Sequence, residues 1–303
     1  MRRFSQRLVR SVSFCHSKFS TSEVLTVKTF VTLVLASALV TLILLVVTHP
    51  NLASANTAVT PQPVPTPSPD LTWIKVGPNK ACGTDGAAPA GSEKAELNQL
   101  KNRFTLPDNF EPFTFDNLLG LNQGQPNAAK TAIVNFPNVS DDENFKKAVT
   151  LEGYVDSVSV GGCSSGESCN CKTQIPQYCD THINVLPEKN SDKRGGRNVY
   201  VVEITRRIRI LASKGLLSSN IGNNWSTAAL TNLEGHRVRF SGYLYFDTDH
   251  SQEAWVNDPE NKIGFQKDNR GRFKRDRWGR KIGNNWRQTA WEVHPVMGIE
   301  VLD

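Results

Sequence analysis

The C-terminal half of the chain alternates apolar and polar side chains with a period of two, and this alternation restricts the possible fold more than any other feature. It is the pattern of β-strands with one buried face, because successive side chains point to opposite sides of a strand. Five such runs follow Ala148. They lie at residues 149–155, 181–185, 199–209, 238–246 and 290–302.

The five runs predict a small β-barrel. Between the third and fourth runs, Asn224 is suited to cap a short helix that continues to Leu233 and ends at Gly235. Five strands with a helix between the third and the fourth follow the element order of the OB-fold, and residues 147–303 suffice for one such core. A mainly β, OB-like barrel is therefore the predicted fold. A β-sandwich or a split sheet is the alternative, because the pattern does not fix strand pairing.

The N-terminus has the layout of an export signal or a membrane anchor. Residues 1–28 hold six basic residues and one acid, and an uncharged apolar run of 18 residues follows from Phe30 to Val47. Ala53-Ser54-Ala55 resembles a signal-peptidase site. Residues 1–55 are therefore predicted to be a signal peptide or an N-terminal transmembrane helix, which contacts the membrane through residues 30–47 if it is not cleaved. The remainder is expected to be periplasmic or extracellular, or anchored to the membrane by its N-terminus.

Export changes the interpretation of the charge. The whole chain carries +6, but residues 1–55 supply six basic residues against one acid, so about +1 remains for the exported part. Any basic surface of that part has to be local. The sequence contains no Gly-rich phosphate loop, Gly-x-Ser-x-Gly elbow or dinucleotide fingerprint, so no nucleotide cofactor is expected.

Two segments separate the N-terminus from the predicted barrel. Residues 56–69 are rich in Pro, Thr and Ser and predict an extended linker. Residues 70–146 are rich in Asn, Gly, Pro and Asp and predict an irregular extension, with one helical stretch from Ser92 to Phe104. Within the barrel, Trp225, Trp286 and Trp291 are interpreted as core anchors.

Five cysteines lie in the exported part, and an odd number leaves at least one without an intramolecular partner. An oxidising compartment favours disulfides over a metal site, although zinc binding and free thiols remain alternatives. The disulfide candidates are the clustered residues Cys163, Cys169, Cys171 and Cys179; the fifth cysteine is Cys82.

Acidic residues and histidines coincide on the predicted strands. Asp180 and His182 share one face of the second strand, and Glu292 and His294 share one face of the fifth. The third strand carries an acid, and two acids and a histidine close the fourth. The candidate catalytic residues are Asp180, His182, Glu203, Asp247, His250, Glu292 and His294.

Imidazole nitrogens and carboxylate oxygens bind zinc or manganese, and they also act as general acids and bases. The candidate ligands of a divalent metal are His182, His250, Glu292 and His294. Two alternatives remain at this point. The acids can serve only to orient the histidines, or the face can form a ligand pocket without a metal.

A basic segment lies between the fourth and fifth strands. Lys267 to Lys281 reads KDNRGRFKRDRWGRK, with eight basic residues against two acids. In OB-folds this connection often contributes to binding oligonucleotides or oligosaccharides. An anionic polymer or a glycan is the expected partner, and a solvated loop without a partner is the alternative. The candidate ligand-binding residues are Arg270, Arg272, Phe273, Lys274, Arg275, Arg277 and Trp278.

Five sequence blocks resemble those of a group of uncharacterised bacterial exported or membrane-anchored proteins with an OB-like barrel domain. The resemblance covers about residues 147–303, extends to the Cys82–Gly86 stretch, and implies a recurrent domain without implying an activity. The basic segment looks like an insertion relative to that pattern. The blocks are VTLEGY (149–154), ESCNC (167–171), DTHI (180–183), VVEIT (201–205) and AWEVHPV (290–296).

The sequence therefore favours an extracytoplasmic binding module whose ligand is an anionic polymer, a glycan or a nucleic acid. A metal-dependent hydrolase of the phosphodiesterase type, using the acid and histidine residues, is the first alternative. A structural envelope or adaptor protein is the second. The ligand, the fate of the apolar segment and the oligomeric state do not follow from the sequence.

Overall fold

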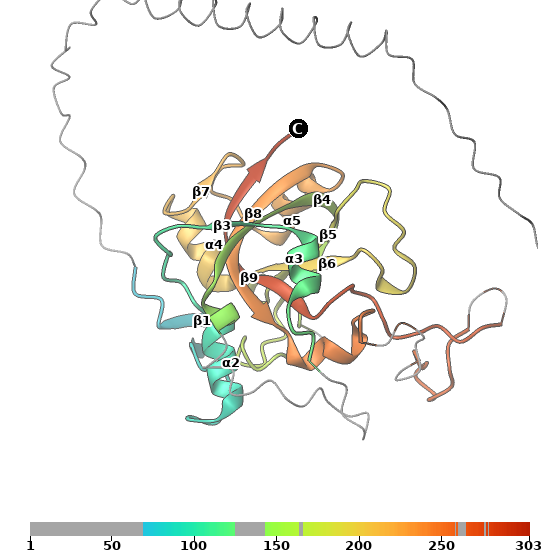
Figure 1. Cartoon of the computed structure of the whole chain (residues 1–303). Coiled ribbons are helices and arrows are strands. Elements are labelled where there is room, and N and C mark those ends of the chain that lie inside the picture. Colours follow the sequence, from blue (N-terminus) through green and yellow to red (C-terminus); the bar gives the residue numbers. More distant parts are fainter. Residues whose placement is uncertain are drawn as a thin grey trace, which may run out of the picture. The chain divides into compact units, whose positions relative to one another are not determined.

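Five strands form a closed barrel in the described part of the chain (Figure 1). Each neighbouring pair is antiparallel except β6 and β9, which run parallel. Around the barrel the order is β4, β5, β6, β9 and β8, and β8 pairs with β4 to close it. The predicted OB-like barrel is confirmed. Its strands are β4 (Ala148–Val160), β5 (Thr181–Leu186), β6 (Tyr200–Ile204), β8 (Arg237–Phe246) and β9 (Trp291–Val301).

This computed structural model describes residues 69–124, 143–163, 166–257, 259, 265–275, 277 and 279–303. All of them belong to one unit, Thr66–Asp303. The predicted signal or anchor (1–55), its apolar run and nearly all of the linker lie outside the described residues, as does Trp278. Among the residues that are described, no helix has the length and apolar character needed to cross a membrane.

The barrel interior is built from one side of the alternating strands. Its side chains are fully buried and apolar, because one parity of each strand faces inward. Examples from successive strands are Leu151, Ile183, Val202, Leu244 and Val293. Trp225 and Trp291 are also buried as predicted, whereas Trp286 lies half-buried at the surface.

The connection between β6 and β8 holds more helix than the sequence suggested. The third strand, expected to reach Arg209, ends at Ile204, and α4 (Arg206–Ser213) follows. Thr205 caps α4 by accepting a hydrogen bond from the Ile208 amide, which turns the apolar run from strand to helix. The second helix, α5 (Thr227–Leu230), is capped by Ser226 instead of Asn224 and continues into the 3-10 turn η4 (Thr231–Leu233).

The extension before the barrel is more regular than predicted. It contains the hairpin β1 (Trp73–Gly77) and β2 (Lys80–Gly83), together with α2 (Glu93–Lys101), which starts at the Ser92 cap inside the predicted helical stretch. Short elements complete the extension and the loops. These are β3 (Glu111–Phe113), α3 (Phe115–Gly120), η1 (Glu143–Lys146), η2 (Pro176–Tyr178), η3 (Arg194–Gly196), β7 (Ser218–Ser219) and η5 (Thr248–Glu253).

The extension is fastened to the barrel by a buried arginine and by a disulfide. Arg207 of α4 donates to the carbonyls of Leu71 and Cys82 and to the side chain of Asn102. Cys82 forms a disulfide with Cys171 in the connection between β4 and β5. The barrel and the extension therefore share one continuous core.

A second disulfide joins Cys163 and Cys179, so three of the four candidate cysteines are bonded. Cys169 is the exception and corrects its assignment as a disulfide candidate, because it is a buried free thiol. The hairpin of β1 and β2 brings Cys82 to Cys171, and Cys169 instead lies beside Glu167. The sequence pattern held no information on this long-range approach.

Candidate functional site

The candidate site lies on the outer face of the barrel strands, opposite the apolar interior. His182 of β5 stands directly opposite Glu203 of β6, and Val202 stands opposite Val293 of β9. The residues flanking Val293 therefore turn outward beside Glu203. These residues are Glu292 and His294, as the alternation predicted.

Glu203 connects two histidines. Its Oε1 lies 2.6 Å from His182 Nε2, and its Oε2 lies 3.1 Å from His294 Nδ1. The same His294 nitrogen lies 3.0 Å from Glu292 Oε1. Four of the predicted residues from three strands thus form one continuous chain of imidazoles and carboxylates.

Arg287 joins this chain to the end of β8. It donates to Asp247 Oδ2 (3.0 Å) and to Glu292 Oε2 (2.6 Å). Asp247 also contacts His250 Nδ1 at 2.6 Å, and Lys101 of α2 lies 3.9 Å from its other oxygen. The two ends of the sheet face are therefore parts of one ionic network.

Asp180 is the seventh predicted residue, and it lies at the edge of the same network. Asn170 donates to its Oδ2 (2.9 Å), and the Cys169 thiol lies 3.9 Å from that oxygen. The structure thus brings all seven acid and histidine candidates together. We call these seven residues with Lys101 and Arg287 the acid–histidine network.

Most of the network is removed from solvent. The side chains of Glu203, Asp247, Glu292 and His294 are no more than 1% exposed. Lys101, the last residue of α2, and Asn102, which caps that helix, cover one side, with Asn102 donating to the carbonyl of Cys169. The extension therefore converts an outward face of the barrel into a buried one.

The charges within the network set the pKa values of its members. Burial by itself would raise the pKa of Glu203, but His182 and His294 hold it well below the usual value. Burial would lower the pKa of His294, yet Glu203 outweighs burial and raises it to about 10. For Asp180, burial prevails over the attraction of His294, and its pKa is raised.

The second imidazole–carboxylate pair behaves in the same way. Burial raises the pKa of Asp247, but Lys101 and His250 together with Arg287 hold it well below the ordinary value. Burial lowers the pKa of His250, but the hydrogen bond to Asp247 and the negative charges of Asp247 and Glu253 together outweigh it and raise the pKa to about 9. His250 therefore carries a positive charge at neutral pH.

Three aromatic rings mark where the network reaches the surface. The side chains of His182 and His250 are 15% and 30% exposed. The Trp286 ring is stacked against His182, with centroids 6.3 Å apart, and meets His250 edge-on at 5.9 Å. We call His182, His250 and Trp286 the rim.

No protein-family model, curated protein or solved structure matches this chain. The interpretation of the site therefore rests on its own geometry. Within the described residues, three sets of side chains can each present ligand atoms that lie within 4.8 Å of one another. They are Glu167, Cys169 and Asp180; Asp180, Glu203 and His294; and Glu203, Asp247 and Glu292. His294 and Glu292 were predicted metal ligands, whereas His182 and His250 belong to none of these sets.

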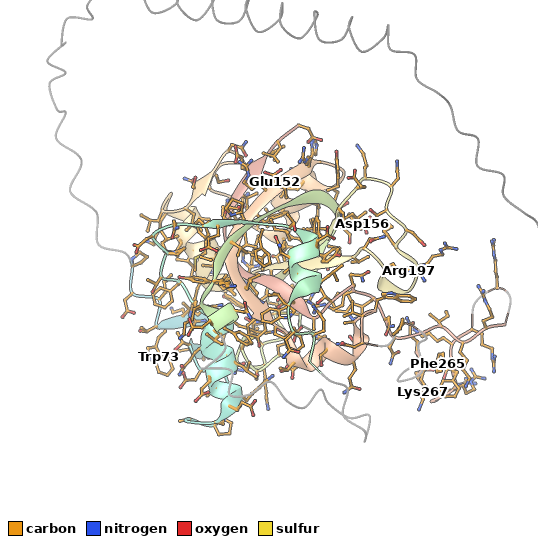
Figure 2. All side chains as sticks on the ribbon, in the orientation of Figure 1. Trp73, Glu152, Asp156, Arg197, Phe265 and Lys267 are labelled. Atoms are coloured by element: carbon orange, nitrogen blue, oxygen red, sulfur yellow. A yellow bond between two sulfur atoms is a disulfide. The ribbon has the colours of Figure 1, made fainter. Side chains whose placement is uncertain are left out.

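The predicted basic segment forms a hairpin-like excursion, and Phe265 and Lys267 lie on it beyond the barrel strands (Figure 2). Isolated bridges pair Phe265 with Gly283 and Lys267 with Phe273. We call residues 265–283 the basic hairpin. Phe273 is 41% exposed, and the ammonium of Lys281 lies 4.1 Å from its ring centroid. The predicted residues Arg270, Arg272, Lys274, Arg275 and Arg277 are exposed on this hairpin.

The basic hairpin joins the barrel at the rim. The amide of Trp286 donates to the Glu253 carbonyl (3.1 Å), and the amide of Trp255 donates to the Arg287 carbonyl (2.8 Å). Arg287 thus links the root of the hairpin to the buried acids. The sequence analysis did not identify Lys101 or Arg287, because neither lies on a strand. The one signal for Arg287 was its position directly after Trp286.

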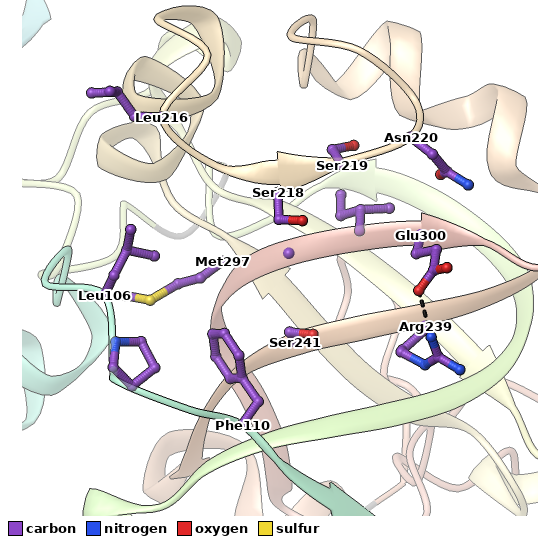
Figure 3. A pocket seen from close by; sticks show the side chains of 13 residues that line it. Leu106, Phe110, Leu216, Ser218, Ser219, Asn220, Arg239, Ser241, Met297 and Glu300 are labelled. Atoms are coloured by element: carbon purple, nitrogen blue, oxygen red, sulfur yellow. Dashed lines mark hydrogen bonds and ion pairs between the residues drawn. The ribbon is translucent and has the colours of Figure 1, made fainter. Parts of the chain in front are cut away.

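A groove lies elsewhere, on the surface of β8 and β9 near β7 (Figure 3). It measures about 680 Å³ and has an ion pair between Arg239 and Glu300 at one end. Apolar side chains such as Phe110 and Met297 line it together with serine hydroxyls. No described residue of the predicted site lines this groove.

Proposed function

We propose that the barrel is an extracytoplasmic binding module for an anionic polymer, which contacts the basic hairpin and the rim together. The position of the hairpin root carries this proposal. Because Trp286 and Arg287 are the residues through which the hairpin returns to the barrel, its cations and the rim rings form neighbouring parts of one surface. A polymer that binds along the hairpin therefore reaches the rim as well.

The chemistry of both parts suits a polyanion. Exposed arginines and lysines neutralise phosphate or carboxylate groups and release their counterions. Phe273 is 41% exposed, and exposed aromatic rings of this kind stack on bases or sugars. The positive charge of His250, whose pKa is about 9, adds an anion contact at the end of this path.

The extracytoplasmic location is part of the same proposal. It is supported by the basic and apolar N-terminal pattern and by two disulfides, which are compatible with an oxidising compartment. Free anionic polymers that such a protein meets include nucleic acids and acidic polysaccharides. The proposal commits to the charge they share and leaves their source to the experiment.

Fluorescence anisotropy of the full chain with a labelled single-stranded oligonucleotide and with a labelled polyuronate tests the proposal, with neutral dextran as the uncharged probe. Arg270, Lys274 and Arg275 are replaced together by Gln, and the control replaces the exposed Lys75, Lys189 and Lys214 by Gln. The hairpin variant is expected to lose affinity, and its salt dependence should flatten by about one unit for each phosphate that it no longer neutralises. Equal effects of the two triple variants would remove the hairpin from the binding surface.

A second candidate function, hydrolysis, is favoured by one specific observation. His182 and His250 are partly exposed, and each is held by a buried carboxylate, which is the arrangement of an imidazole that transfers protons. Turnover of bis(p-nitrophenyl) phosphate by the full chain, lost in a folded His250→Gln chain, is the result expected for a phosphodiesterase. Binding of polymer without any turnover leaves the module a binding protein.

A further inference from the structure

We infer that the acid–histidine network binds one divalent cation through Asp180, Glu203 and His294. These residues come from the start of β5, from β6 and from β9, so three segments of the barrel wall meet at the site. The inference concerns a different ligand from the proposed polymer. It holds whether or not the polymer binds.

The donor atoms are close enough for direct ligation. One atom from each side chain lies within 4.8 Å of the other two. Three such atoms share a point at most about 2.8 Å from each, whereas zinc bonds to nitrogen and carboxylate oxygen are about 2.0–2.2 Å long. Side-chain shifts of less than about 1 Å therefore complete the coordination.

One atom of Asp180 and one atom of His294 have no hydrogen-bond partner among the described residues. They are Asp180 Oδ1 and His294 Nε2, both on side chains that are almost completely buried. A polar atom that is buried without a partner destabilises the fold, because its lost contacts with water are not replaced. A cation bound between these atoms satisfies both at once.

Neighbouring groups already orient the two ligands. Asn170 fixes the other oxygen of Asp180, and Glu292 contacts the Nδ1 atom of His294. The latter leaves Nε2 without a partner, and a cation that binds there displaces the proton of that nitrogen. A carboxylate behind a ligating imidazole is the usual outer support of a bound metal.

The two other clusters are less suited to a cation. Asp247 and Glu292 both accept hydrogen bonds from the Arg287 guanidinium, whose charge repels a metal placed between them. In the remaining set, Cys169 points its thiol at Glu167. Among the three sets, that of Asp180, Glu203 and His294 is the one that includes a histidine nitrogen without a hydrogen-bond partner.

One imidazole with two carboxylates is a ligand set for Zn²⁺ or Mn²⁺. Titration calorimetry of the EDTA-treated full chain with each metal is expected to give one equivalent of binding and an increased unfolding temperature. Asp180→Asn keeps the size and the Asn170 neighbour, and it is expected to lower the affinity at least about tenfold. His236→Gln, an exposed histidine paired with Asp303, is the matched control and is expected to bind like the wild type.

Cobalt substitution identifies the ligands independently of these variants. Co²⁺ bound by oxygen and nitrogen gives no thiolate charge-transfer band, and Cys169→Ser is expected to leave its spectrum unchanged. A thiolate band that disappears in Cys169→Ser would assign the cation to the cysteine cluster and overturn the inference. Folded wild-type chain that neither binds nor is stabilised by either metal would also overturn it, even if Asp180→Asn fails to fold.

Discussion

The two faces of β6 and β9 are equally buried but chemically opposite. The inner face carries Val202 and Val293, and the outer face carries Glu203, Glu292 and His294, all no more than 1% exposed. Burying the inner side chains stabilises the fold by about 25 cal/mol for each Å² of apolar surface. Burying the outer ones costs several kcal/mol for each ion before pairing offsets it. The gain in folding stability therefore explains why the inner side chains are buried, but it does not explain the burial of the outer ones.

The outer face persists because its charges are paired. Arg287 and Lys101 face the carboxylates, and the imidazoles of His250 and His294 are held in their charged form. Such networks are seldom the most stable way to fill a buried space, and strongly shifted pKa values concentrate at functional sites. Burial alone therefore does not identify the apolar core of this barrel.

The largest effect is expected from Arg287→Met, which leaves Asp247 and Glu292 buried without their shared cation. Removing one partner of a buried ion pair costs about 3–5 kcal/mol of unfolding free energy. Urea denaturation measures the loss. The exposed Arg237→Met, which pairs with Glu152 at the surface, serves as the control and should cost no more than about 1 kcal/mol. Similar losses in both variants would contradict the difference between the faces.

Leu244→Ala tests the inner face and should cost about 2–5 kcal/mol, because it opens a cavity in the barrel core. At temperatures where the variant remains folded, its affinity for Zn²⁺ and for the labelled oligonucleotide should equal that of the wild type. Calorimetry and anisotropy check this. A folded Leu244→Ala chain that no longer binds either ligand would show that the two faces are coupled.

Gly161→Ala is expected to displace the His182 ring of the rim. A β-carbon at Gly161 overlaps the ring of His182, so the imidazole has to move. Overpacking of this kind costs about 1–3 kcal/mol, and polymer affinity measured by anisotropy should fall severalfold. The control is Gly120→Ala, where a β-carbon meets nothing within 4 Å. Unchanged polymer affinity in a folded Gly161→Ala chain would show that His182 does not contribute to polymer binding at the rim.

The smallest effect concerns pH. Burial lowers the pKa of His250, and the positive charge of Arg287 also lowers it. Asp247 and Glu253 outweigh these effects and raise the pKa to about 9. The unfolded value is about 6.5. The charged ring therefore contributes its full stability below about pH 6.5 and loses it as the pH rises through about 9. Urea denaturation across this range should show the decline, and His250→Gln should flatten it; an equal decline in that variant would assign it to other groups.

The alternation in sequence was enough to predict the five strands and which residues share a face. It placed Glu203, Glu292 and His294 away from Val202 and Val293, as the structure has them. This succeeds because a period of two is a local property of the backbone. The closed barrel was predicted from the order of the elements, because the alternation alone does not fix strand pairing.

The burial of the outer face was not predictable in the same way. Lys101 approaches from α2, and Arg287 comes from the return of a loop, so their contacts with Asp247 join residues 40 to 146 positions apart along the chain. No periodicity encodes such approaches. The third strand was predicted to extend beyond the observed end of β6 for a related reason. An apolar run continues across Thr205, and only the capping hydrogen bond shows where the helix begins.

The Cys82–Cys171 disulfide affects how firmly the site is covered. It closes a separation of 89 residues and is the covalent link between the extension that covers the acid–histidine network and the barrel. In a reducing compartment the same cover is held only by contacts such as those of Arg207. The disulfide therefore limits how far the extension can move away from the charged face when those contacts break.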